Sequence, residues 1–201
     1  MFKLLLATTN QGKVSEVSAL LKNYRVQIIT LNEFENIQEV EETGNTFLEN
    51  ANLKSFGYAC QTGCLTLADD SGLEVEALNG KPGVFSARFA GLKASDEDNI
   101  NKLLSEMKST KQENRKAQFI SVMSVSNPNR TEFNSEGICK GSIALNPIGS
   151  NGFGYDPVFI PAGYEQTFGQ LEGKIKEKIS HRSIALNKII NYFTANYHFP
   201  T

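Results

Sequence analysis

The chain opens with the stretch Phe2-Lys3-Leu4-Leu5-Leu6-Ala7-Thr8-Thr9-Asn10-Gln11-Gly12-Lys13, in which an apolar run passes directly into a polar turn. The run, residues 2–7, predicts a buried strand and is too short for a secretory signal or a membrane span. The next apolar residues recur at helical spacing, and residues 26–31 predict a second strand. A strand–helix–strand opening of this kind favours an α/β fold.

The rest of the chain also mixes helices and strands. A capping box at Thr46 and Glu49 begins a helix that is expected to end near residue 61, before Gly63. Residues 117–126 and 131–143 predict two long strands that form a hairpin, and a hairpin within an α/β pattern predicts a mixed sheet. The other expected elements are strands at 65–68, 73–78 and 158–160, a turn at 69–72, an irregular segment at 80–91, a helix begun by Ser95 and Asp98, and a closing helix capped by Ser180 or Ser183.

Composition limits the classes of function. The 201 residues are 40% hydrophobic and 21% charged, which is typical of one globular domain that needs no disulfide or zinc. A net charge of −2 gives no overall attraction to nucleic acid or to anionic membranes, so neither is an expected partner. Three cysteines without a C-x-x-C pair argue against a zinc site and favour a reducing cytoplasm.

Two segments are candidates for binding phosphate. Residues 8–13 follow a strand and open a helix, so that backbone N–H groups, hydroxyls and Lys13 would meet there, although the P-loop pattern is absent. Ser180-His181-Arg182 begins the closing helix, whose N-terminus attracts anions, and the Arg182 guanidinium matches phosphate geometry. The alternatives are a polar turn with a surface lysine and a solvated basic face.

Carboxylates gather at two places. Asp69-Asp70-Ser71-Gly72 follows an apolar strand, and two adjacent carboxylates repel each other unless something holds them there. Either could bind Mg²⁺ or deprotonate a water molecule. Glu41-Glu42-Thr43-Gly44 precedes the capped helix and could complete a metal site. A plain turn and a solvated acidic loop are the alternatives.

The main glycine-rich loop is Gly152-Phe153-Gly154-Tyr155-Asp156-Pro157. Its start is similar to a dinucleotide-binding fingerprint, but it does not join a strand to a helix. The aromatic pair could stack on a purine, and Asp156 could accept a hydrogen bond from it. The alternative is a turn with aromatic residues of the core.

Together these segments resemble the inosine/xanthosine triphosphate pyrophosphatase family, which acts on noncanonical purine nucleotides. The resemblance covers nearly the whole chain, and the motifs stand in the family's order. They are residues 7–13; Glu42-Thr43-Gly44, Thr46-Phe47, Glu49-Asn50-Ala51 and Lys54; residues 67–73 with Pro82-Gly83 and Ser86-Ala87-Arg88; residues 152–157; and residues 179–182. The sequence departs from the family at Gln170, Ile175-Lys176-Glu177 and Ser183, which leaves Lys174 and Lys178 as competitors of Lys176.

The resemblance implies a single two-lobed domain over residues 1–201, with a long curved mixed β-sheet flanked by helices and a substrate cleft between the lobes. It implies a cytoplasmic homodimer that depends on Mg²⁺. The implied reaction converts ITP, dITP and XTP to the nucleoside monophosphate and pyrophosphate, which keeps these nucleotides out of DNA and RNA.

By position, the resemblance makes Asp70 the proton acceptor and a magnesium ligand, with Glu41 as the other ligand. The residues implied to hold the triphosphate are Thr8, Thr9, Asn10, Gln11, Gly12, Lys13 and Ser71. Those implied to hold the purine and sugar end are Phe153, Gly154, Tyr155, Asp156, Lys176, His181 and Arg182. Whether Asp69 shares the metal stays open. The alternative functions are a nucleotide-binding sensor without turnover and a phosphatase on a related fold.

Overall fold

The computed structural model describes residues 2–197 and 199, and it confirms the predicted α/β class. Within those residues six strands form one mixed sheet in the order β2-β1-β3-β4-β5-β6. The strands are β1 (Phe2–Leu6), β2 (Val26–Thr30), β3 (Thr66–Val75), β4 (Lys116–Asn127), β5 (Arg130–Ile143) and β6 (Phe159–Pro161). The α-helices are α1 (Gln11–Leu21), α2 (Phe47–Thr62), α3 (Asp96–Glu106), α4 (Gly173–Ile179) and α5 (His181–Tyr197). Strand β1 pairs in parallel with β2 and β3, whereas β5 and β6 are antiparallel.

The chain divides into two compact units. Unit 1 comprises Met1–Asp70, Ser121–Gly137 and Arg182–Thr201, and unit 2 comprises Ser71–Ile120 and Ile138–His181. Strands β3, β4 and β5 therefore each contribute residues to both units. Each unit has a hydrophobic core of its own.

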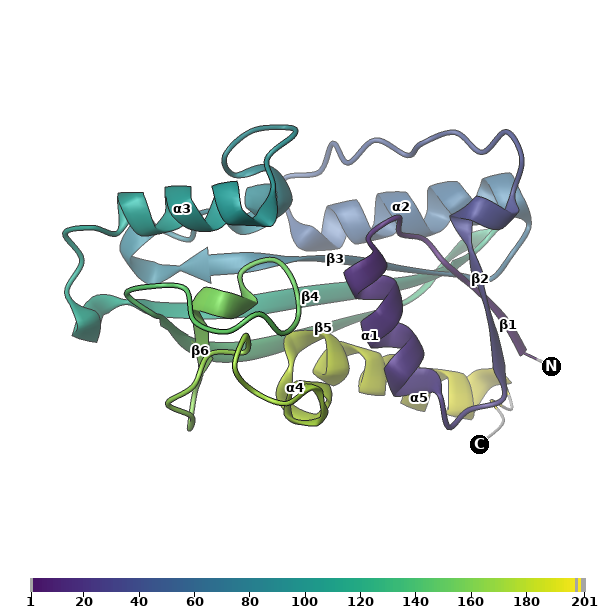
Figure 1. Cartoon of the computed structure of the whole chain (residues 1–201). Coiled ribbons are helices and arrows are strands. Elements are labelled where there is room, and N and C mark those ends of the chain that lie inside the picture. Colours follow the sequence, from purple (N-terminus) through teal and green to yellow (C-terminus); the bar gives the residue numbers. More distant parts are fainter. Residues whose placement is uncertain (1, 198, 200–201) are drawn as a thin grey trace. The chain divides into compact units, whose positions relative to one another are not determined.

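In unit 1, strict alternation along the strands sends side chains to two different cores. Leu4 and Leu6 of β1 and Leu67 of β3 pack in one cluster with residues of α1 and α5. Leu5 of β1 and Ala68 of β3 pack in another cluster with a residue of α2. Successive residues of a strand point to opposite faces, so α1 and α5 cover one face of the sheet and α2 covers the other. Figure 1 shows α2 and α5 on opposite sides of these strands.

Helix α2 is fixed at both ends and along its buried face. The predicted capping box of Thr46 and Glu49 is present, and Gly63 ends the helix in the left-handed conformation. On the buried face Ser55 Oγ lies 2.7 Å from the hydroxyls of both Ser124 and Ser126 of β4. These hydrogen bonds hold one face of α2 at a defined position over β4.

Two local predictions differ from the structure. The break predicted at residues 69–72 is wrong, because β3 continues through them from Thr66 to Val75. The irregular segment expected at 80–91 contains a 3-10 helix, Gly83–Arg88. The closing helix α5 begins at His181, within the predicted motif, and the basic run before residue 180 forms the short helix α4. The continuous β3 has the largest consequence, because it carries both aspartates.

Candidate active site

Asp69 and Asp70 lie in the middle of β3 and point to opposite faces of the sheet. Asp69 follows Leu67 by two residues and shares its face with α1 and α5, whereas Asp70 follows Ala68 and shares its face with α2. Both are nearly fully buried, with 1% and 6% of their surfaces exposed. The repulsion between adjacent carboxylates is therefore relieved by separation and by different cationic partners.

The carboxylate of Asp69 is the centre of a buried ion-pair network. Its Oδ2 accepts hydrogen bonds from Arg182 Nε and Nη2 at 3.2 and 3.1 Å and lies 3.0 Å from Lys13 Nζ. Its Oδ1 accepts a hydrogen bond from Ser121 Oγ at 2.6 Å. Burial acts to raise the pKa of Asp69, but Arg182 and Lys13 outweigh it and hold that pKa well below its usual value. The carboxylate of Asp69 is therefore ionised at neutral pH.

The carboxylate of Asp70 has a different environment. Its Oδ1 accepts a hydrogen bond from Lys54 Nζ at 3.0 Å, and Lys54 also lies 3.2 Å from Glu42 Oε1. Among the described residues, Asp70 Oδ2 is buried without a hydrogen-bond partner. Burial raises the pKa of Asp70 and Glu42 adds to this effect, whereas Lys54 and Lys13 oppose it. An unpartnered carboxylate oxygen of this kind can accept a proton or bind a cation.

Of the two neighbouring glutamates, the structure brings Glu42 to Asp70. Glu42 pairs with Lys54. Burial acts to raise the pKa of Glu42, but Lys54, Asp70 and Lys13 together outweigh it and lower that pKa. Glu41, the expected metal ligand, is exposed and has no hydrogen bond or ion pair to the described residues. No group of three acidic, histidine or cysteine side chains converges on a metal position within residues 2–197 and 199. The metal role of Glu41 stays a prediction.

The predicted phosphate loop lies at the start of α1. Asn10 caps this helix, and its Oδ1 accepts a hydrogen bond from the Lys13 amide at 3.1 Å. Thr9, Asn10 and Gln11 are exposed, whereas Thr8, Gly12 and Lys13 are half-buried. Because the first amides of a helix have no partner within it, this loop can donate hydrogen bonds to an anion. Ser71 is half-buried in β3 and belongs to unit 2.

Arg182 and His181 are neighbours in sequence but have different surroundings. Arg182 belongs to unit 1, where it pairs with Asp69 and with Glu16 of α1. His181 belongs to unit 2, where its ring stacks on Phe119 with centroids 4.7 Å apart. The structure therefore places Arg182 with the same carboxylate as Lys13 of the phosphate loop. A role of either residue in binding the purine stays a prediction.

In unit 2 the glycine-rich loop contains a second buried ion pair. Lys176 Nζ pairs with Asp156 Oδ2, which also accepts a hydrogen bond from the Phe153 amide at 2.9 Å. Lys176 lies 4.9 Å above the Phe153 ring, whereas its competitors Lys174 and Lys178 are exposed. Lys176, the lysine that the resemblance implies, is therefore the lysine of α4 that contacts the loop.

The loop depends on glycine residues with a positive φ and on two anchors. Gly152 has a φ of +76°, and a Cβ atom there would lie 1.9 Å from Asp156 Oδ2. The Gly154 amide donates to Asp96 Oδ2 at 2.7 Å. The Tyr155 hydroxyl donates to the Ser86 carbonyl at 2.8 Å, and its ring lies in the core of unit 2. Of the predicted aromatic pair, Phe153 is thus the half-exposed member that has surface left for stacking.

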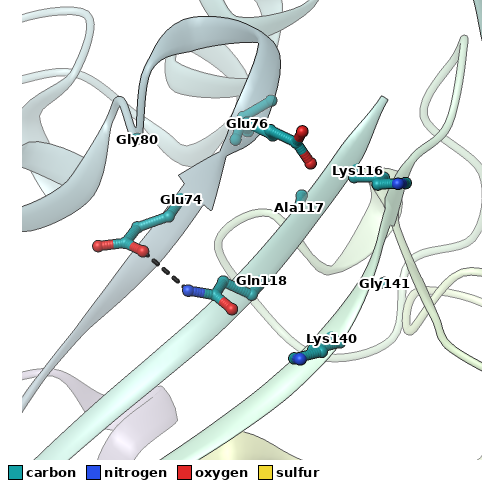
Figure 2. Close-up of a pocket in the computed structure, with 9 residues that line it drawn as sticks. Glu74, Glu76, Gly80, Lys116, Ala117, Gln118, Lys140 and Gly141 are labelled. Atoms are coloured by element: carbon teal, nitrogen blue, oxygen red, sulfur yellow. Dashed lines mark hydrogen bonds between the residues drawn. The ribbon is translucent and has the colours of Figure 1, made fainter. Parts of the chain in front are cut away.

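A surface hollow of about 430 Å³ also lies in unit 2, at the ends of β3 and β4 and beside β5 (Figure 2). Its charged lining residues are Glu74, Glu76, Lys116 and Lys140, and Gln118 donates a hydrogen bond to Glu74 at 2.9 Å. Its lining includes none of the predicted site residues.

Three polar residues that hold Arg182, Asp70 or Asp69 in unit 1 were missed as functional residues. Glu16 lies one turn after Lys13 in α1, so the two side chains share one face of the helix. This spacing is visible in the sequence. Lys54 belongs to the helix-entry motif, but no role followed from its position. Ser121 lies in the middle of a long strand of apolar and hydroxyl residues, and no sequence signal distinguishes it from Ser124 or Ser126.

Comparison with known proteins gives consistent matches over nearly the full length. The model of the Ham1 family matches residues 4–192. A protein of Desulforamulus reducens named dITP/XTP pyrophosphatase is 47% identical over 195 residues, which are 97% of each chain. The solved structure of a HAM1 protein from Coxiella burnetii has a TM-score of 0.88 and 40% identity, covering 97% of this chain and all of that one. The Ham1 protein of Staphylococcus aureus has a TM-score of 0.84 and 42% identity, covering 96% and 98%. No helix within the described residues has the length and apolar character that crossing a membrane requires.

Proposed function

The chain belongs to the Ham1 family, and on this basis we propose that it hydrolyses noncanonical purine nucleoside triphosphates to the monophosphate and pyrophosphate. The proposed substrates are ITP, dITP and XTP, and the proposed role is to remove them from the nucleotide pool. Relatives named dITP/XTP pyrophosphatase support the reaction. The observation that carries it is the buried Asp70 carboxylate, which has one oxygen on Lys54 and one without a partner.

The residues of unit 1 supply the chemistry on the phosphates. Lys13 donates two hydrogen bonds to Asp69, and an ammonium group has three donors, so one N–H is left for a phosphate oxygen. Asp70 Oδ2 is the atom that accepts a proton from the attacking water, while Lys54 holds the other oxygen in place. Positioning and electrostatic stabilisation therefore account for most of the proposed rate enhancement.

We propose Mg²⁺ as the cofactor, because the donors present suit it. Mg²⁺ commonly binds through one or two carboxylates together with the substrate phosphates, so that a complete protein cage is not needed. The carboxylates of Asp70 and Glu42 would hold it, and when bound it would neutralise charge on the phosphates. Glu41 is the ligand that the resemblance implies, one residue away from the glutamate that pairs with Lys54.

A pair of matched variants separates the two glutamates. Glu42→Gln should raise the Mg²⁺ concentration needed for half-maximal activity by roughly ten- to a hundredfold, the usual cost of weakening a metal site. Glu41→Gln, with the same change one residue away on an exposed side chain, should leave that concentration unchanged. Titration of activity with Mg²⁺ measures both. The opposite ranking would restore Glu41 as the ligand.

The residues of unit 2 are proposed to bind the base. Phe153 offers a half-exposed ring for stacking, and the loop amides and Lys176 offer hydrogen-bond donors to a 6-oxo group. A donor that meets the O6 of hypoxanthine or xanthine would face an amino group in adenine, and an unpaired buried donor is costly. This difference supports selection of ITP and XTP over ATP.

We further propose that the enzyme acts as a homodimer in the cytoplasm. The three cysteines support a reducing compartment, because all are free of disulfides in the structure. Sedimentation of the purified protein at micromolar concentration would test the dimer.

Product analysis is the direct test of the proposed reaction. With Mg²⁺ present, ITP should yield IMP and pyrophosphate in equal amounts with little IDP, because water attacks the α-phosphorus. Anion-exchange chromatography of the nucleotides, with a separate pyrophosphate assay, measures both products.

The same experiment decides among the alternatives. Accumulation of IDP with inorganic phosphate would favour the phosphatase. Binding of ITP without any product would favour the sensor module.

A further inference from the structure

Cationic side chains from three helices converge on one residue of β3. Lys13 of α1 reaches both the carboxylate and the carbonyl oxygen of Asp69, at 3.0 and 3.1 Å. Lys54 of α2 reaches the same carbonyl oxygen at 3.1 Å. Arg182 at the start of α5 donates twice to the carboxylate, and Ser121 donates to its other oxygen. A single buried aspartate thus links the cations of α1, α2 and α5 to the sheet.

By charge alone, this aspartate is unfavourable for an anionic ligand. An anion attracted by Lys13 and Arg182 is repelled by a carboxylate that lies 3.0 to 3.2 Å from them. A compensating benefit is geometric, because lysine carries a flexible side chain with rotatable donors. Two bonds to one buried residue fix the ammonium group of Lys13, and the third donor is then held at a defined position.

We propose that Asp69 is a positioning residue that holds Lys13 in place for the phosphate groups of the substrate, and that it is not a metal ligand. The proposal deepens the proposed function and rests on it. Both carboxylate oxygens of Asp69 are hydrogen-bonded to protein groups. Asp70, the expected metal ligand, lies on the opposite face of the sheet.

The direction in which pyrophosphate affinity changes in Asp69→Asn distinguishes a positioning role from an effect of charge alone. Isothermal titration with inorganic pyrophosphate in one magnesium-containing buffer should show roughly tenfold or greater weakening for Asp69→Asn, as for the loss of a charged hydrogen bond. If Asp69 contributed only its charge, the same variant would bind pyrophosphate more tightly. Asp69→Glu keeps the charge and moves the carboxylate by one methylene group, and it should also weaken binding.

A double-mutant cycle shows whether Asp69 acts through Lys13. In a Lys13→Met background, Asp69→Asn should weaken pyrophosphate binding by a smaller factor than in the wild type, because residues that share an interaction are not additive. A role limited to general stability would give the same factor in both backgrounds.

Two further variants keep the test decisive. Asp98→Glu is the matched control, because Asp98 is an exposed capping-box residue where glutamate is favoured, and pyrophosphate affinity should not change. Ser121→Ala removes the hydrogen bond that orients the Asp69 carboxylate without touching a cation. It should weaken binding roughly two- to tenfold. If circular dichroism shows that Asp69→Asn does not fold, the affinity of Ser121→Ala for pyrophosphate tests the positioning role instead.

The possible results separate this proposal from the proposed function. Unchanged or tighter pyrophosphate binding by Asp69→Asn, or by Ser121→Ala if the former is unfolded, would overturn the positioning role even if wild-type protein hydrolyses ITP. A higher Mg²⁺ requirement of Asp69→Asn, matching that of Glu42→Gln, would overturn its exclusion from the metal site. Weakened binding in a protein that leaves ITP intact would support the positioning role and reject the proposed reaction.

Discussion

Asp70→Asn is expected to lower kcat for ITP by roughly 10²–10⁴-fold while the fold is retained. The substitution keeps the size of the side chain and can preserve the contact with Lys54. It removes the negative charge and places an amide, or an uncharged oxygen, where Asp70 Oδ2 now has no partner. Because that atom is the proposed proton acceptor, the loss should appear in kcat, measured by pyrophosphate release at saturating ITP.

The matched control is Asp98→Asn, which makes the same chemical change in an exposed aspartate of unit 2. Its kcat should equal that of the wild type. A far-UV spectrum and a melting curve for both variants separate lost chemistry from lost structure. If Asp70→Asn kept more than about a tenth of the wild-type rate, Asp70 would not be the proton acceptor.

Asp156→Ala is expected to lower the free energy of unfolding by about 3–5 kcal/mol, the usual cost of removing one partner from a buried ion pair. Asp156 is 1% exposed and Lys176 is 9% exposed, so the lysine would lose its counter-charge inside the protein. The Phe153 amide would lose its acceptor as well. Chemical denaturation measures the change in the free energy of unfolding, because the midpoint of the unfolding curve and its dependence on denaturant are obtained separately.

A second substitution tests whether the buried charge causes this loss. In the Asp156→Ala background, Lys176→Met should recover part of the lost stability, because it removes the unpaired charge. Lys178→Met, on the same helix but exposed, should recover none. Equal behaviour of the two double variants would indicate that the carboxylate stabilises the loop through Phe153 and not through Lys176.

The predictions for the fold succeeded where local signals are strong. The first strand, the capping box of α2 and the hairpin of β4 and β5 all follow from short-range patterns. The turn predicted at residues 69–72 failed because aspartate, serine and glycine favour turns only when nothing else holds them. Here Arg182, Lys13 and Lys54 compensate both carboxylates, and these partners are distant in sequence.

The candidate site could be predicted as a set of residues but not as an arrangement. The motifs indicated Asp70, Lys13 and Lys176, and the resemblance implied Glu41, not Glu42, as the second metal ligand. In the structure Lys54 pairs with Glu42 and not with Glu41. Lys54 lies on the buried face of α2, one turn after Asn50. Arg182 and His181 are adjacent in the motif, but a helix turns about 100° per residue, so their side chains meet different neighbours.

The alternation of β3 makes the number of residues in this strand a constraint in its own right. Adding or deleting one residue between Leu67 and Asp69 would exchange the faces of everything that follows. Asp69 would then meet α2, and Asp70 would meet α1 and α5, each with the wrong cations. During divergence this segment should therefore tolerate replacement of side chains far better than changes of length. Insertions and deletions should accumulate instead in connections such as the turn at residues 127–129.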